Sequence, residues 1–142
     1  MIISTEEQAN ATALISRYAR SADAGDADGV VGCFTDDVVL SLNGGDLVLN
    51  NRNEASDFYH RTVKGFSTHL LANYGFERVG SALVVNCTAV AFLCRKEGVV
   101  TVKGLAYAFE CVGSEADLRI RKVNHSAQWE CEAAGGPNLA VE

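Results

Sequence analysis

The stretch that decides the fold is residues 17–37, RYARSADAGDADGVVGCFTDD. Its first part completes a helix predicted over residues 6–22, with Thr5 as its N-cap. Apolar side chains in that helix recur at steps of three and four residues, namely Ala11, Leu14, Ile15, Tyr18 and Ala22. Gly25 predicts the helix end, and Asp26 predicts the N-cap of a short second helix over 27–34. The stretch therefore carries two polar side chains, Tyr18 and Asp23, to the junction of two helices.

The rest of the chain predicts one more helix and a set of strands. Asn43-Gly-Gly predicts a hairpin between strands at 38–42 and 46–49. Asn53 predicts the cap of a third helix over 54–63, which Gly65 ends. From residue 67 the hydrophobic period changes to two, which predicts strands at 67–78, 81–95, 98–112 and 117–130. Their short connections favour antiparallel pairing.

Helices followed by a strongly paired sheet indicate an α+β fold. We expect a cone-shaped, curved, mostly antiparallel sheet wrapped round the N-terminal helices, with a small-molecule pocket at its open end. Residues 1–131 are expected to form a single domain. Residues 132–142, which include Gly135-Gly-Pro-Asn138, are expected to form a flexible C-terminal tail.

The composition excludes several classes of protein. With 12 Lys+Arg against 18 Asp+Glu, the net charge is −6 and no basic face for nucleic acid is expected. No apolar run reaches the about 18 residues of a membrane span, and no signal peptide is evident, which predicts a cytoplasmic protein. The five cysteines are odd in number and lack C-x-x-C spacing, so we expect reduced thiols. No pattern predicts a metal site or a cofactor.

One pattern along the opening stretch is Tyr18-x4-Asp23-Ala-Gly-Asp26-x7-Phe34-x-Asp36-Asp37. It resembles the nuclear-transport-factor-2-like superfamily, particularly its SnoaL-like members. The closing segment from Asp117-Leu-Arg-Ile-Arg to Trp129 is similar to the last strand of that family. The likeness covers about residues 5–130 and implies the α+β barrel fold. The same fold carries dehydratases, isomerases, cyclases, epoxide hydrolases and subunits without catalytic activity.

Two branches of that superfamily lack their essential residues here. Residues 17–37 are similar to the opening of ketosteroid isomerases, and Tyr18 matches their oxyanion-hole tyrosine. However, Leu42 occupies the position of their base, and residues 104–108 contain no second acid. The aspartates that limonene-type epoxide hydrolases carry on facing strands are also missing, because residues 67–78, 81–95 and 98–112 contain no Asp.

The dehydratase branch fits better. In scytalone dehydratase, bile-acid dehydratase and the related dehydrochlorinase, an Asp at the end of the first helix pairs with a His on the first long strand. Asp23 and His69 match those positions. Scytalone dehydratase also uses a second His on the next strand, where residues 90–94 contain none. This departure puts that particular substrate in doubt, whereas a reaction with a single base remains possible.

A His–Asp pair suits proton transfer alpha to a carbonyl. Unperturbed imidazole titrates near ~6.5, so this type of side chain can act as a base at neutral pH. The carboxylate of Asp23 would orient the ring and stabilise the imidazolium, and the hydroxyl of Tyr18 would hold the oxyanion. The alternative is that none of the three is catalytic. His69 would then be a half-buried strand histidine, Asp23 a solvated carboxylate at a helix end and Tyr18 a core tyrosine.

Five further residues are predicted to bind substrate: Tyr59, Asn73, Tyr107, Arg121 and His125. Asn73 would share the face of His69, because strand residues two apart point the same way. His125 alternates with Val123, Ala127 and Trp129, and Arg121 has the same parity. His125 is also a candidate second acid–base, and Arg121 a candidate partner for a substrate carboxylate. The alternatives are structural. Tyr59 and Tyr107 would only pack in the core, Asn73 would hydrogen-bond buried backbone, and Arg121 would be solvated.

These residues predict a cofactor-independent lyase or isomerase of the dehydratase or cyclase type. Its substrate would be a hydrophobic carbonyl compound, such as a polyketide, a steroid-like ring or an aromatic. The alternative is a non-catalytic domain that binds a small molecule or resembles the beta subunit of aromatic-ring dioxygenases. A homodimer or a higher homo-oligomer is expected, because long strands that are apolar on both faces need cover.

Overall fold

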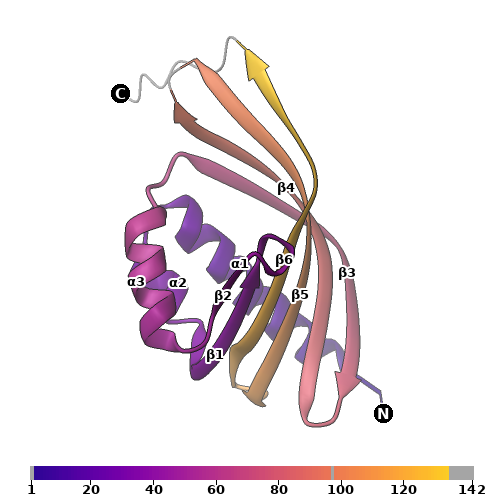
Figure 1. Cartoon of the computed structure of the whole chain (residues 1–142). Helices are drawn as coiled ribbons and strands as arrows, with labels where there is room; N and C mark the ends of the chain where they lie inside the picture. Colours follow the sequence, from indigo (N-terminus) through magenta and orange to yellow (C-terminus); the bar gives the residue numbers. More distant parts are fainter. Residues whose placement is uncertain (1, 97, 135–142) are drawn as a thin grey trace.

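The computed structural model describes residues 2–96 and 98–134 and has the predicted α+β architecture (Figure 1). In these residues two α-helices are followed by two strands, a third helix and four further strands. Their bounds are α1 Thr5–Asp23, α2 Ala27–Val31, β1 Phe34–Leu42, β2 Leu47–Leu49, α3 Arg52–Thr62, β3 Ser67–Val79, β4 Ala82–Lys96, β5 Val99–Ser114 and β6 Asp117–Ala134. A short 3-10 turn, Asn43–Gly45, joins β1 to β2.

The six strands form one curved sheet in the order β2-β1-β6-β5-β4-β3. The chain folds β3 to β6 as a run of antiparallel neighbours, as the short connections predict. The pairing of β1 with β6 is parallel, and it joins the first strand to the last. The expectation of a curved, mostly antiparallel sheet with N-terminal helices is therefore confirmed.

The concave side of the sheet holds the helices and the core (Figure 1). Helix α1 presents one buried stripe to the sheet, because its apolar residues recur every three or four positions. The stripe consists of Ala11, Leu14, Ile15, Tyr18 and Ala19. Full burial of a Leu or Ile side chain contributes about 1.5–3 kcal/mol. Packing of this stripe therefore fixes where the last residue of α1, Asp23, lies.

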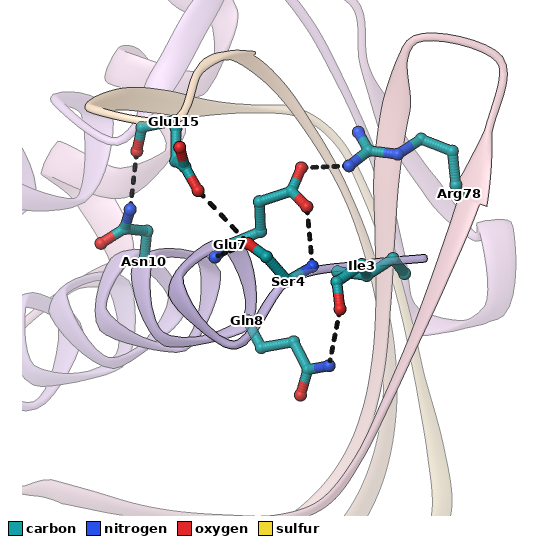
Figure 2. Close-up of polar contacts among 7 residues, drawn as sticks. All are labelled: Ile3, Ser4, Glu7, Gln8, Asn10, Arg78 and Glu115. Atoms are coloured by element: carbon teal, nitrogen blue, oxygen red, sulfur yellow. Dashed lines mark hydrogen bonds and ion pairs between the residues drawn. The ribbon is translucent and has the colours of Figure 1, made fainter. Parts of the chain in front are cut away.

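Polar contacts tie the first turn of α1 to two hairpins of the sheet (Figure 2). Ser4 and Glu7 form a capping box, in which Ser4 Oγ accepts from the Glu7 N–H at 3.1 Å and Glu7 Oε2 accepts from the Ser4 N–H at 2.9 Å. Glu7 also pairs with Arg78 near the end of β3. On the next turn, Asn10 Nδ2 donates to the Glu115 carbonyl at 2.8 Å. These contacts hold α1 at the end remote from Asp23.

Several element ends differ from the predictions. Ser4 caps α1 in place of Thr5, and Asn51 caps α3 in place of Asn53. The second helix ends at Val31, where β1 soon begins. Strand β6 continues to Ala134, so the first three residues of the segment predicted to be loose are extended and paired with β5. The remainder of that segment lies outside the described residues.

Three chemical features of the fold bear on function. No helix of the described residues is long and apolar enough to cross a membrane. Within residues 2–96 and 98–134, no group of three or more His, Cys, Asp or Glu could hold a metal ion. All five cysteines are free thiols. Burial raises the pKa of Cys87 to about 11 and of Cys111 to about 12, so neither is a nucleophile at neutral pH.

Candidate active site

Asp23 and His69, which are 46 positions apart in sequence, lie in direct contact. Nδ1 of His69 is 2.6 Å from Oδ1 of Asp23. The backbone N–H of His69 donates to Oδ2 at 2.9 Å, and the hydroxyl of Ser67 donates to Oδ1 at 2.8 Å. Three donors thus satisfy the carboxylate. Only 16% of the His69 side chain and 23% of the Asp23 side chain are exposed, so solvent screens the pair little.

This contact determines the tautomer of His69. An ionised carboxylate only accepts hydrogen bonds, so Nδ1 carries the proton that lies toward Asp23. In the neutral ring, Nε2 then has the free lone pair and is the basic atom. A carboxylate hydrogen-bonded to Nδ1 can stabilise an imidazolium ring.

Two glycines allow the backbone crossing that brings the dyad together. Gly25, after α1, and Gly65, before β3, have φ of +74° and +76°. A Cβ built on Gly25 would lie 3.1 Å from the backbone nitrogen of Gly65. The two loops can approach this closely because neither glycine carries a side chain, and the approach places the end of α1 beside Ser67.

A second polar pair lies deeper in the cone. The hydroxyls of Tyr18 and Tyr59 are 3.1 Å apart, and both side chains are buried. Burial raises the pKa of Tyr18, and burial together with Tyr18 raises the pKa of Tyr59 well above its usual value. Both therefore remain protonated at neutral pH. One hydroxyl donates to the other, which leaves the second O–H free to donate to a ligand.

Both tyrosines, Ser67 and His69 line one cavity of about 240 Å³ between the helices and the inner face of the sheet, whereas Asp23 is not part of its lining. Its wall combines apolar side chains with a few polar groups, as small-molecule sites do. The lining residues are Tyr18, Ala22, Leu42, Asn43, Phe58, Tyr59, Thr62, Val63, Lys64, Gly65, Ser67, His69, Ala91, Leu93, Lys103, Leu105, Tyr107 and His125. Leu42 and Leu105 thus form wall where ketosteroid isomerases need acids.

His125 lines the cavity from β6 and has the opposite tautomer to His69. Its Nδ1 accepts a hydrogen bond from the backbone N–H of Asn43 at 3.3 Å. Because that N–H can only donate, the proton of the neutral ring lies on Nε2. Burial, followed by the charges of Lys103 and His69, lowers the pKa of His125. At neutral pH the ring is a neutral donor of one hydrogen bond.

The other residues predicted to bind substrate divide into two groups. Tyr59 and Tyr107 line the cavity, and the Tyr107 ring packs against His125 with centroids 5.0 Å apart. Asn73 and Arg121 do not line it, and the prediction that they face it is wrong. Asn73 is exposed and donates to the hydroxyl of Thr88, while Arg121 pairs with Glu110.

β-bulges explain both errors. Strand β3 has one extra residue between Ala72 and Gly75, and Asn73 within it has a φ of +57°. Strand β6 has one extra residue, Arg121, opposite the step from Glu110 to Cys111 in β5. Each bulge breaks the two-residue alternation on which the predictions depended. Strand β6 has a second bulge near Gln128, which turns Trp129 to the outer face.

Sequence reasoning also missed a residue of the site. Lys103 lines the cavity from the inner face of β5. Its parity with Leu105 and Tyr107 was available from the sequence, because alternate residues of a strand share a face. A single lysine in a long strand gave no other signal.

Taken together, a curved α+β sheet wrapped round helices, with a cavity of mixed apolar and polar lining, is an arrangement typical of small-molecule sites. A model of the SnoaL-like domain matches residues 4–124, and the chain belongs to this family. No protein with a curated description matches the sequence significantly.

Solved structures share the whole fold. A candidate scytalone dehydratase from Novosphingobium aromaticivorans is 14% identical with a TM-score of 0.80, covering 96% of this chain and 95% of that one. A candidate aromatic-ring hydroxylase from the same organism is 19% identical with a TM-score of 0.82, covering 94% and 96%. A hexachlorocyclohexane dehydrochlorinase of type 2 is 14% identical with a TM-score of 0.79, covering 94% and 95%. At these identities the likeness establishes the fold alone.

Proposed function

We propose that the protein is a cofactor-independent lyase or isomerase that removes a proton alpha to a carbonyl group. The observation that carries this proposal is the 2.6 Å contact between His69 Nδ1 and Asp23 Oδ1 at the wall of a cavity. A binding protein needs no basic nitrogen oriented in this way. The similarity in fold to a candidate dehydratase and to a dehydrochlorinase agrees with an elimination.

In the proposed reaction, Nε2 of His69 takes the alpha proton and the C–H electron pair moves onto the carbonyl oxygen as an enolate. The free O–H of the Tyr18–Tyr59 pair donates to that oxygen. A hydrogen-bond donor at this position stabilises the negative charge that develops on the oxygen. The imidazolium of His69 then returns its proton. If a beta-hydroxyl receives it, water leaves and an enone forms; if carbon receives it, the double bond shifts.

His125 has a supporting part in this scheme. Its neutral Nε2–H donates a hydrogen bond to a substrate oxygen but does not transfer its proton, because the imidazolate that would result is too basic. The acid and the base are thus the two protonation states of a single residue, His69. Because His69 serves as both base and acid, the proposed reaction needs no second histidine on β4.

The test is turnover of a panel of one-ring beta-hydroxy ketones, followed by the absorbance of the enone product. We expect His69→Ala and Asp23→Asn to reduce turnover by about 10²–10⁴-fold, the usual size of a general-base contribution. Ser67→Ala should reduce it less, because two of the three donors to Asp23 remain. Binding of the ketones without any turnover by the unmodified protein would support the non-catalytic binding domain instead.

We further propose a homodimer formed through the outer face of the sheet, in the cytoplasm. Leu70 and Trp129 on that face are 58% and 51% exposed, and both line a shallow apolar groove over β3 to β6. Exposed apolar surface of this kind favours association. The five free thiols suit a reducing compartment.

A further inference from the structure

The charge of the cavity is opposite to that of the molecule. The chain has 18 Asp+Glu and 12 Lys+Arg, yet the charged residues that line the cavity within the described part of the chain are two lysines, Lys64 and Lys103. The nearest carboxylate of the site, Asp23, lies behind His69 and is already satisfied by three donors. The cavity therefore presents uncompensated positive charge to a ligand.

Lys103 is the main source of this charge inside the cavity. It is half-buried and lines the cavity from the inner face of β5, as Leu105 and Tyr107 do. Within residues 2–96 and 98–134, no carboxylate forms an ion pair with it. Glu130 is its register partner on β6, but the Glu130 side chain is exposed to solvent. The ammonium of Lys103 therefore has no ion-pair partner among the described residues, and a bound anion would supply one.

His125 adds a second donor to the cavity that Lys103 lines. The acceptance of a hydrogen bond by Nδ1 leaves Nε2–H on the other side of the ring. The charge of Lys103 is also, after burial, a cause of the lowered pKa of His125. An ammonium from β5 and an N–H from β6 together suit an anion with two oxygens.

We propose that Lys103 and the Nε2–H of His125 form a carboxylate-binding subsite, so that the substrate is a one-ring carbonyl compound that carries a carboxylate. The size of the cavity supports one ring, because about 240 Å³ exceeds the roughly 150 Å³ that accommodates benzene. The exposed Lys64 at the rim would attract such an anion. The carbonyl half of this substrate rests on the proposed function, whereas the carboxylate half rests on Lys103 and His125.

The test compares the binding of two probes of nearly the same shape, 4-acetylbenzoate and its neutral analogue 4-acetylbenzamide. Dissociation constants are measured by calorimetric titration for the unmodified protein and for two variants. We expect the unmodified protein to bind the acid about tenfold more tightly than the amide, as a charged hydrogen bond would give. Lys103→Met should abolish this preference. Lys122→Met removes the same charge from an exposed site outside the cavity and should retain it.

Two further measurements separate the subsite from a folding defect and from the catalytic proposal. Lys103→Met should raise the pKa of His125 in an NMR titration. Only a folded variant would give this result, so the titration also excludes a folding defect. His69→Ala should keep the preference for the acid even though it loses proton abstraction. The subsite is contradicted if the unmodified protein does not prefer the acid, including failure to bind either probe. It is also contradicted if Lys103→Met retains the preference.

Discussion

The hydroxyls of Tyr18 and Tyr59 share one hydrogen bond, and this sharing predicts the behaviour of both residues. If either hydroxyl is removed, the other loses its partner and its orientation toward the substrate oxygen. We expect Tyr18→Phe and Tyr59→Phe each to lower kcat by about 10²–10³-fold, as loss of an oxyanion donor does. The double variant should be little worse than either single one, because the pair acts as a unit. Tyr74→Phe, at a tyrosine outside the cavity, is the control, and additive losses would contradict the shared role.

His125 and His60 predict opposite effects of pH on stability. The pKa of His125 is lowered, chiefly by burial, so its stabilising contribution is present above the unfolded pKa of ~6.5 and is lost as pH falls through the folded pKa. The pKa of His60 is raised, chiefly by its hydrogen bond to the Ser56 carbonyl, so its contribution is present below ~6.5 and is lost as pH rises through the folded pKa.

Urea denaturation on both sides of pH ~6.5 measures this difference. His125→Gln should reduce the loss of stability on acidification, whereas His60→Gln should increase it. The same sign for both variants would contradict the contrasting environments of the two rings.

At the scale of single residues, the dyad was predictable from the sequence and parts of the pocket were not. The pairing of Asp23 with His69 follows from the match of both positions to the dehydratase branch, and the two side chains are in contact. Asn73 and Arg121 were assigned to the pocket on parity, and bulges moved them out of it. A bulge depends on contacts with the neighbouring strand, so the local sequence contains little signal for it.

At the scale of elements, the crossing of the two glycine loops positions the dyad. Gly25→Ala would introduce a Cβ 3.1 Å from the backbone of Gly65 at a φ of +74°. Gly80→Ala is the matched control, because its φ is +60° but its Cβ would meet nothing within 4 Å. Both should lose about 1–2 kcal/mol of unfolding free energy from the left-handed backbone. Only Gly25→Ala should also lower turnover, and equal turnover in the two variants would contradict the positioning role.

The presence of the helices and strands follows from hydrophobic periodicity. Their ends depend on which of several nearby residues caps the element. Thr5 and Asn53 are both good N-cap residues, but Ser4 and Asn51 cap the helices. Ser4 forms a capping box with Glu7, and Glu7 is also held by its ion pair with Arg78. The parallel pairing of β1 with β6 had no local signal, since it joins strands from the two ends of the fold.

At the scale of the whole molecule, the outer face of the sheet predicts a dimer. Leu70→Glu would introduce a charge into the exposed apolar groove on that face. We expect this variant to sediment as a monomer while its circular dichroism remains unchanged, because Leu70 is exposed in the isolated chain. Val48→Glu, at an exposed valine of β2 outside that groove, should remain dimeric. If the Leu70→Glu variant remains dimeric, the proposal that this groove forms the dimer interface is wrong.

The central claim is that His69, oriented by Asp23, removes a proton next to a carbonyl. Solvent deuterium incorporation measures this step whichever product follows. A panel of one-ring ketones, with and without a carboxylate, is incubated with the protein in D₂O and followed by proton NMR. We predict exchange at the alpha carbon above the buffer rate for the carboxylate-bearing ketones, strongly reduced in Asp23→Asn and absent in His69→Ala. Exchange at the buffer rate for every ketone, or exchange that persists in His69→Ala, would contradict the account.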